Sequence, residues 1–318
     1  ILGERSGLQR VAVTGVAAGD ERAYVLTQLI GPVAAGDRVV LNTTAVELGL
    51  GTGGWHVVHW NLSREAWSEP GPGHVMKLRY TSLQVDAGAA EEHGDPGRDL
   101  GGMPVVACGL HSQVAAVAAV VKHLAPGARL AYVMTDGAAL PLALSDLVHD
   151  LRAASLLDLT VSTGQAFGGD LEAVNLHSGL ALARRHGADV AVAGVGPGVV
   201  GTGTALGHTG LDVTAVVLAA RALGGRPVVA GRASDADPRP RHRGLSHHTT
   251  TALELARAAA ADGVVAAAPE PDESTPDVGR LLAALGVRVT SMGRGPEDDP
   301  ALFQWAGAAG AAAARMLA

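Results

Sequence analysis

Short apolar runs recur along this sequence from residue 103 onward, and an alanine- and leucine-rich segment with helical spacing follows each run. The repeat length is about 25 to 35 residues, which is the spacing of strand–helix units in parallel sheets. Because the runs are continuously apolar rather than alternating, the strands should be covered on both faces. Seven strands are expected, at residues 104–108, 129–134, 157–162, 189–193, 227–231, 263–267 and 287–291.

This pattern predicts an α/β fold built on a doubly wound, mostly parallel sheet. The alternative is a (β/α)8-like barrel whose first strand is supplied by residues 74–85. The loops between the repeats have uneven lengths, which favours the open sheet. Helices are expected at residues 112–124, 140–153, 172–186, 211–223, 247–261, 277–285 and 300–316.

The first 62 residues have a different pattern, in which apolar and polar positions alternate in short runs separated by turns. We expect residues 1–62 to form a small N-terminal β-barrel domain, because closure removes the exposed edges of a short all-β unit. Residues 63–73 include the sequence Glu-Pro-Gly-Pro-Gly and are expected to be a linker. Residues 74–318 should then form the α/β domain, with a ligand cleft at the carboxyl ends of its strands.

Composition excludes several classes of protein. With 47% hydrophobic residues and a mean hydropathy of +0.22, the chain is too apolar to be disordered. The long charge-free stretch over residues 190–211 contains seven glycines and a proline, which excludes a spanning helix there. The net charge of −7 argues against a nucleic-acid partner, and the single cysteine, Cys108, excludes an intrachain disulfide. No basic leader precedes an apolar core, so we expect a cytoplasmic protein with no membrane partner.

The strongest single feature is a glycine-rich loop, residues 194–210, after the fourth strand of the α/β region. Its glycines let a ligand approach the backbone, and the backbone amides can form an anion cradle. Part of the loop matches the Rossmann dinucleotide fingerprint, but a helix should open at once and does not, so this match is poor. Loop flexibility or close helix packing would also account for the glycines. The ligand-binding candidates here are Gly196, Gly198, Gly201, Thr202 and Gly203.

Histidine is abundant, with 13 residues, and several histidines fall in loops that should converge at the carboxyl ends of the strands. Neutral imidazoles beside a carboxylate can transfer protons or bind a divalent metal, although no spaced metal-binding motif is present. The structural alternative is that these histidines cap helices or form hydrogen bonds with carbonyl groups of the glycine-rich loop. The candidates for catalysis or metal binding are His111, Asp136, His208 and His247.

An arginine-rich loop, residues 232–243, follows the fifth strand and carries four arginines against two aspartates. It precedes a helix whose first turn has free amides, an arrangement suited to a phosphate or a carboxylate. We expect Arg241, Arg243 and His248 to contact such an anion. The alternatives are an exposed loop kept soluble by its charge, or NADP binding with Arg232 near the 2′-phosphate.

Four separated segments resemble an uncharacterised bacterial family catalogued only as a domain of unknown function. The resemblance spans nearly the whole chain but implies no catalytic roles. It implies that the N-terminal region and the α/β part form a single unit, with residues 42–54 facing the same cleft. The segments are residues 41–54, residues 73–81, the glycine-rich loop and residues 243–249.

These observations favour an enzyme that binds a small anionic molecule, phosphorylated or nucleotide-like, and acts as a hydrolase or a group transferase. A non-catalytic metabolite sensor or scaffold is the second hypothesis, and an NADP-dependent oxidoreductase is the third. The sequence does not assign a cofactor, although a divalent metal is a candidate. The alanine-rich C-terminal helix should pack on its own domain or on a second subunit of a homo-oligomer.

Overall fold

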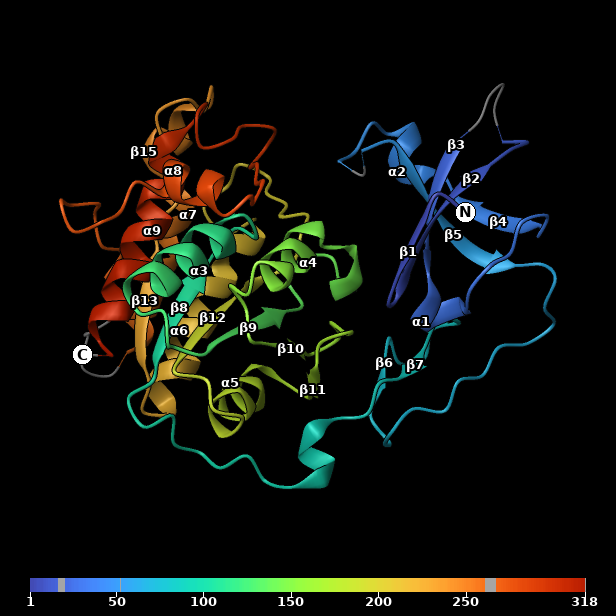
Figure 1. Cartoon of the computed structure of the whole chain (residues 1–318), viewed down its shortest axis with the longest axis horizontal. Helices are drawn as coiled ribbons and strands as arrows, with labels where there is room; N and C mark the ends of the chain where they lie inside the picture. The colour runs from blue at the N-terminus through green and yellow to red at the C-terminus, as the bar shows by residue number, and fades with distance from the viewer. Residues whose placement is uncertain (17–20, 52, 261–266, 318) are drawn as a thin grey trace. The chain divides into compact units, whose positions relative to one another are not determined.

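The computed structural model describes residues 1–16, 21–51, 53–260 and 267–317. The chain forms two compact units, Ile1–Gly88 and Ala89–Ala318 (Figure 1). The first unit contains the all-β region and continues past the predicted linker to Gly88. Among the helices of the described residues, none is both long enough and apolar enough to cross a bilayer.

The first unit is built on a mixed five-stranded sheet with the strand order β1-β2-β3-β5-β4. Neighbouring strands run antiparallel except β3 and β5, which are parallel. No pairing among its described strands joins β1 to β4, so closure into the predicted barrel is not observed there. The elements are β1 (Gly3–Arg5), β2 (Leu8–Val13), β3 (Glu21–Leu26), α1 (Thr27–Ile30), β4 (Val39–Asn42), α2 (Thr44–Glu47) and β5 (Trp55–Asn61).

The prediction of one strand over residues 74–85 is wrong. This segment contains only the ends of a hairpin, β6 (Met76–Lys77) and β7 (Val85–Asp86), which pair antiparallel in a sheet of their own. Between them Leu78 and Tyr80 have φ angles of 51° and 62°. A strand cannot continue through this left-handed region, so the segment turns back instead of joining the larger sheet.

The second unit is built on a six-stranded parallel sheet with the order β11-β10-β9-β12-β8-β13, which confirms the α/β prediction. Within the described residues the sheet has β11 and β13 at its ends. Its strands are β8 (Pro104–Cys108), β9 (Leu130–Thr135), β10 (Leu159–Thr163), β11 (Leu171–Ala173), β12 (Val190–Val195) and β13 (Arg226–Ala230). The short strands β14 (Ala233–Ser234) and β15 (Gly244–Leu245) form a separate ladder.

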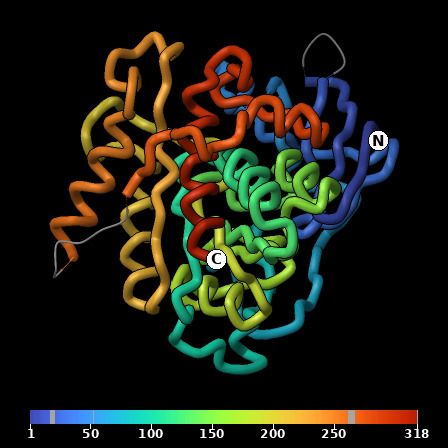
Figure 2. Tube along the Cα trace, turned by 60° about the vertical axis from the view of Figure 1, so that its left-hand side comes forward, coloured from blue at the N-terminus to red at the C-terminus, as the bar shows by residue number. Residues whose placement is uncertain are grey.

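Helices cover both faces of this sheet. Successive strand residues point to opposite faces, so Val106 and Tyr132 pack under α3, α4, α8 and α9, whereas Val105 and Val133 pack under α5, α6 and α7. Figure 2 shows the C-terminal helix α9, in red, running beside α3. The helices are α3 (Gln113–Leu124), α4 (Asp146–Ala153), α5 (Leu176–Arg185), α6 (Asp212–Ala222), α7 (His247–Ala259), α8 (Val278–Ala284) and α9 (Pro300–Arg315).

Two predicted elements of this unit differ from the structure. The strand expected at residues 287–291 is absent, because Val287 and Val289 are buried against the helical layer of α3, α8 and α9 without pairing along a strand. A helix is expected to begin at residue 172, but strand β11 occupies this position. Helix α5 starts only after its N-cap, Asn175. Residues 263–266 of the sixth predicted strand lie outside the described residues, although Ala267 accepts a hydrogen bond from the backbone of Val229 in β13.

Gly310 on α9 has no room for a side chain, because a Cβ there would lie 2.9 Å from the backbone oxygen of Val117 on α3. We expect Gly310→Val to lower the free energy of unfolding by about 1 to 3 kcal/mol, since the two helices must move apart. Ala312→Val, at a partly buried position of the same helix, is the control. Urea unfolding followed by helical circular dichroism measures both; equal midpoints would contradict the expectation.

Candidate functional site

Two loops at the carboxyl edge of the six-stranded sheet meet at the candidate site. One is the glycine-rich loop after β12, and the other runs from the end of β13 to the start of α7. The helices that follow adjacent strands β8 and β12 lie on opposite faces of the sheet, so their loops diverge at this edge. Crevices at such points are the usual ligand sites of open α/β sheets.

The glycine-rich loop folds back on itself as a small arch. Gly201 and His208 pair across it in an antiparallel bridge, and the Thr202 backbone N–H donates to the Gly207 oxygen at 2.7 Å. The Thr209 backbone N–H donates to the Val200 oxygen at 3.0 Å. Some backbone amides of the arch are therefore used in internal hydrogen bonds, and His208 lies on one of its two paired segments.

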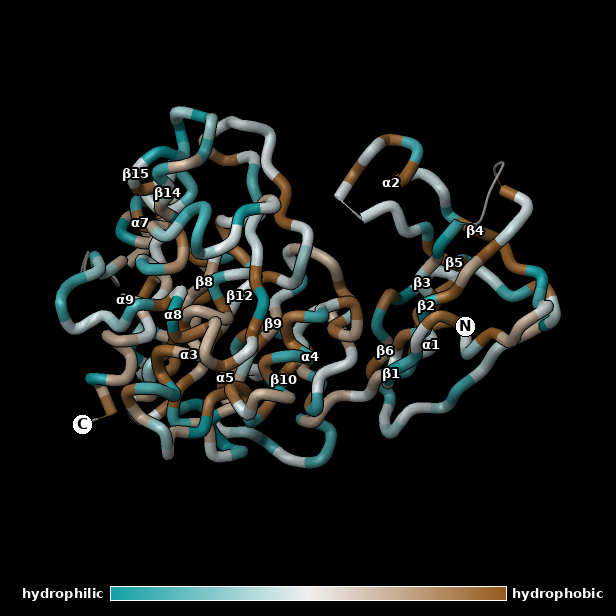
Figure 3. Tube along the Cα trace, turned by 45° about the horizontal axis from the view of Figure 1, so that its top comes forward, coloured by the Kyte–Doolittle hydropathy of each residue, from teal (hydrophilic) through white to brown (hydrophobic). Residues whose placement is uncertain are grey.

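The second loop is fixed at the start of α7 by Ser246. Its side-chain oxygen accepts a hydrogen bond from the backbone N–H of His248 at 3.2 Å, which caps the helix. The same oxygen lies 2.7 Å from Nδ1 of His242, and the Ser246 backbone N–H donates to the Arg232 oxygen. Figure 3 shows the segment around β14 and β15 as largely hydrophilic. These bonds hold the histidine pair of the first helical turn against the loop.

Four imidazoles gather where the two loops meet, and we call them the histidine cluster: His208, His242, His247 and His248. The rings of His208 and His248 are stacked, with centroids 3.7 Å apart and planes 5° apart. His247 lies 4.5 Å from His248 and 5.4 Å from His208, centroid to centroid. One nitrogen from each of His208, His247 and His248 falls within 4.8 Å of the others, a separation that a metal ion could bridge.

Neighbouring groups fix the protonation of two rings. His208 Nε2 lies 3.1 Å from the Ala205 carbonyl oxygen, so it must carry the proton and donate. Nδ1 of His208 is therefore an acceptor, and it is buried without a hydrogen-bond partner. His248 Nδ1 accepts a hydrogen bond of 3.0 Å from Nη1 of Arg232, because a guanidinium can only donate. Nε2 of His247 is also buried without a partner.

The imidazoles are neutral at pH 7. Burial is the largest cause of a lowered pKa in each ring, and the positive charge of neighbouring side chains adds to it. Burial, followed by the charge of Arg232, lowers the pKa of His242 from 6.5 to about 4 and that of His248 to about 2. Uncharged rings can accept a proton or bind a metal.

A network of arginine and aspartate side chains stabilises the second loop. The fully buried carboxylate of Asp237 is 2.8 Å from Arg239, 3.3 Å from Arg294 and 3.9 Å from Arg232. Hydrogen bonding by Arg239 is the largest cause that holds the pKa of Asp237 well below its usual value. Asp299, also fully buried, accepts hydrogen bonds from Arg294 and from a serine. Three guanidinium groups thus face two buried carboxylates, which leaves excess positive charge beside the histidine cluster.

Arg241 joins the two loops. A Cβ at Gly203 would lie 3.4 Å from Cζ of Arg241, so the guanidinium group lies against the backbone of the arch. Among the described residues no carboxylate forms an ion pair with Arg241. A Cβ at Gly201 would lie 3.5 Å from Nε2 of His248, and a Cβ at Gly210 would lie 3.1 Å from Nδ1 of His208. Six predicted site residues are therefore brought together: Gly201, Gly203, His208, Arg241, His247 and His248.

The other predicted site residues have separate surroundings. Gly196 packs against the Ala139 carbonyl oxygen, and a Cβ at Gly198 would meet no described atom within 4 Å. The Thr202 hydroxyl bonds within the arch, and Arg243 donates from Nε to the Asp237 backbone oxygen.

His111 is buried away from the cluster's contacts, with partners of its own. Its Nε2 lies 2.7 Å from the Ser145 hydroxyl, and its Nδ1 lies 3.1 Å from the Tyr132 hydroxyl and 3.3 Å from the Val195 oxygen. These contacts tie the loop after β8, the middle of β9 and the end of β12 to the N-cap of α4. These hydrogen bonds give His111 a structural role.

Asp136 belongs to a second polar group, at the end of β9. It accepts a hydrogen bond from the Gln165 backbone N–H at 3.1 Å. Its charge, together with the larger effect of burial, raises the pKa of Asp212 at the start of α6. Thr135 donates to Asp212 at 2.6 Å. Asp212 could not be singled out from the sequence, because nothing local marks it as the neighbour of Asp136.

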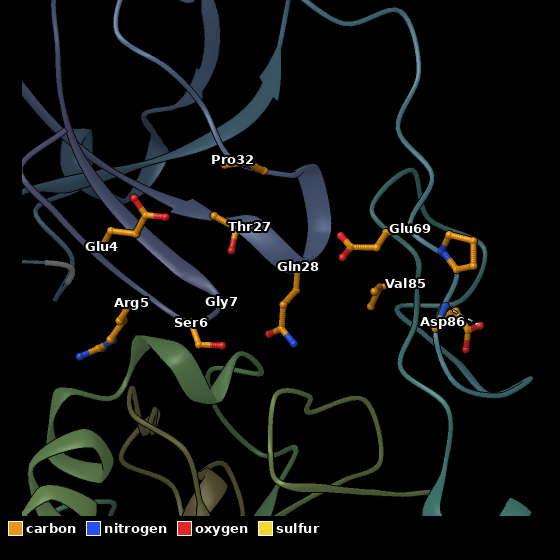
Figure 4. A pocket seen from close by; sticks show the side chains of 12 residues that line it. Glu4, Arg5, Ser6, Gly7, Thr27, Gln28, Pro32, Glu69, Val85 and Asp86 are labelled. Carbon is orange, nitrogen blue, oxygen red and sulfur yellow. Dashed lines mark hydrogen bonds between the residues drawn. The ribbon is translucent and has the colours of Figure 1, made fainter.

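A separate pocket of about 620 Å³ lies in the first unit (Figure 4). Its charged side chains are the carboxylates of Glu4, Glu69 and Asp86 and the guanidinium of Arg5, so its lining is mainly acidic. One carboxylate oxygen of Asp86 already accepts the Gly71 backbone N–H at 3.1 Å. This pocket contains none of the predicted site residues, and no sequence motif indicated it.

The sequence model of one family, described as proteins of unknown function (DUF3866), matches residues 22–275, well over half of the chain. The chain belongs to this family. The resemblance stated from the sequence is thereby confirmed. The matched range contains the arch and the whole histidine cluster, whereas Arg294, Asp299 and α9 lie beyond it. No curated protein and no solved structure matches the chain.

Proposed function

We propose that the chain is an enzyme that binds a small anionic molecule, phosphorylated or nucleotide-like, and hydrolyses it or transfers a group from it. The observation that carries this proposal is the position of Arg241, without a carboxylate partner among the described residues, beside the histidine cluster and the Gly203 backbone. Arg241 is exposed, and a guanidinium that lies against the arch can direct its donors to a phosphate or a carboxylate.

The surrounding charge supports an anion rather than a neutral ligand. Asp237 and Asp299 are the buried carboxylates of the network, and their oxygens already accept hydrogen bonds from Arg239 and Arg294. Two positive charges are less well balanced. Arg232 lies 3.9 Å from the Asp237 carboxylate, and Arg241 has no carboxylate partner among the described residues. A bound anion would balance them.

The imidazoles give the site its reactive groups. Nδ1 of His208 and Nε2 of His247 are buried nitrogens without partners, and both lie in the cluster beside Arg241. Such nitrogens can take a proton from an attacking hydroxyl or water, or hold a metal that activates it. Arginine for charge and imidazole for proton transfer are the groups that phosphoryl or acyl transfer requires, which is why hydrolysis or group transfer is the reaction class proposed.

Arg241→Ala tests the anion site. We expect the variant to bind inorganic phosphate or ATP about tenfold more weakly, a loss of about 1.4 kcal/mol, because a charge-assisted contact is removed. Arg280→Ala, at an exposed arginine of α8, is the matched control. Isothermal titration and ligand-dependent thermal shifts measure the effect. Equal affinities of the two variants for every anion tried would refute the assignment.

The same titrations separate the other two hypotheses. Stabilisation by a metabolite without any product would favour the sensor, whereas turnover favours the enzyme. Stabilisation by NADPH but not by NADH would favour the oxidoreductase. For that third hypothesis the buried position of Arg232, which already donates to His248, offers little support, since a 2′-phosphate needs an accessible guanidinium.

A further inference from the structure

We propose that His208, His247 and His248 form a binding site for one divalent transition metal of the zinc class. The proposal rests on the site of the proposed function and names its cofactor. One nitrogen from each ring lies within 4.8 Å of the other two, and rotation of the side chains would bring the three nitrogens to the spacing of ligands around one ion.

The unpartnered lone pair of His208 is the independent observation that points to a metal. The side chain is 7% exposed, its Nε2 donates to the Ala205 oxygen, and its Nδ1 is buried without a donor. Leaving a buried acceptor unsatisfied is costly. A fully deprotonated anion cannot relieve that cost, because a lone pair needs a donor or a Lewis acid, and a metal ion is the second of these.

In a metal-binding histidine, the ring nitrogen that does not bind the metal usually donates a hydrogen bond to a carboxylate, a backbone carbonyl or water, and this bond orients the ring. The Ala205 oxygen provides this bond for His208. Gly210 keeps the opposite side open, because a Cβ there would lie 3.1 Å from Nδ1 of His208 and 3.3 Å from Nδ1 of His248. Both features favour Nδ1 of His208 as the ligand atom.

Arg232 must release His248 when the metal binds. If Nδ1 of His248 becomes the ligand, it can no longer accept from Arg232. If Nε2 becomes the ligand, its proton moves to Nδ1, which then faces the guanidinium as a second donor. In both cases Asp237, already 3.9 Å from Nη2 of Arg232, is the carboxylate that receives it. The stacked rings of His208 and His248 must also turn, because a metal lies in the plane of each imidazole that binds it.

The ligand set selects the class of metal. Three imidazoles without a carboxylate suit zinc and its neighbours, whereas magnesium and calcium require oxygen ligands. Three protein ligands leave a fourth position open, as in catalytic zinc sites. That position would take water or an oxygen of the anion held by Arg241. A metal there would activate water or polarise the anion.

Cobalt titration tests the site on the full chain after treatment with a chelator. We expect one Co²⁺ per chain, with the visible absorption of a four-coordinate ion, and displacement by Zn²⁺. His208→Ala and His247→Ala should each weaken binding by on the order of 100-fold. His177→Ala, an exposed histidine of α5, is the matched control, and His242→Gln tests whether the fourth ring is needed.

The outcomes separate this proposal from the proposed function. Absence of a Co²⁺ spectrum, or a spectrum unchanged by both alanine variants that retain native circular dichroism, would overturn the metal site. If a variant fails to fold, His208→Asn replaces it, since asparagine keeps polarity but supplies a poor ligand. Phosphate titration of the metal-free chain is the second arm: retained phosphate binding that depends on Arg241 would leave the anion site standing without the metal.

Discussion

Asp237→Asn is expected to lower the free energy of unfolding by about 3 to 5 kcal/mol, the range found when one partner of a buried ion pair is removed. The carboxylate is fully buried and faces Arg239, Arg294 and Arg232. Asparagine has the same shape but no charge, so it leaves these guanidinium groups to repel one another. Arg232 is 5% exposed and cannot turn to water, so its charge would remain buried without the carboxylate that now faces it.

Asp277→Asn is the control for this variant. Asp277 caps α8 through the Arg280 backbone N–H and pairs with the Arg280 side chain, whose exposed fraction is 90%. Asparagine caps a helix as well as aspartate does, and exposed pairs contribute about 1 kcal/mol or less. Denaturant unfolding, followed by helical circular dichroism, compares the two variants. A midpoint for Asp237→Asn as high as that for Asp277→Asn would show that the network does not hold the loop.

The parallel sheet could be predicted because its signal is local. The runs that form β8, β9 and β12 are almost entirely apolar, a pattern typical of strands covered on both faces, whereas β10 contains two threonines and a serine. Residues 287–291 show the limit of the signal. Val287 and Val289 would look the same in a strand as in a segment that packs on helices, since burial alone sets their type.

Short elements escaped prediction for another reason. β11 has only three residues, too few for any periodicity, and it depends on the turn at Gly169, where a Cβ would lie 2.8 Å from the Ser162 backbone nitrogen. The hairpin β6–β7 depends on left-handed φ angles at Leu78 and Tyr80. Neither residue type favours that conformation, so the sequence carried no sign of the turn.

The meeting of the two loops could be inferred from topology, because parallel strands end at one edge of a sheet. The network behind them could not. Arg294 and Asp299 lie 57 and 65 residues along the chain from their partners Asp237 and Ser234, and no spacing rule connects them. His111 was grouped with the other histidines for the same reason. The sequence shows which loop contains a histidine, but not whether hydroxyl groups already form hydrogen bonds with its ring nitrogens.

His111 should make stability depend on pH. Its partners are the hydroxyls of Tyr132 and Ser145 and the Val195 oxygen, all neutral. Ser145 Oγ also accepts the Val148 backbone N–H, so its own proton is available for Nε2 of His111. A proton added to Nε2 would displace that bond in a buried site. Burial accordingly lowers the pKa of His111 from 6.5 to about 4, with a smaller opposing effect of the Val195 oxygen.

The sign follows from proton counting. Between pH 6.5 and about 4 the unfolded chain binds a proton at His111 and the folded chain does not, so acid favours unfolding. The stabilisation is complete above pH 6.5 and is lost as the pH falls towards 4, by up to about 3 kcal/mol. His111→Gln keeps a polar amide in place but cannot titrate, so its unfolding free energy should fall less over this range. Because the other histidines titrate equally in both proteins, the difference between the two curves isolates His111, and parallel curves would contradict the prediction.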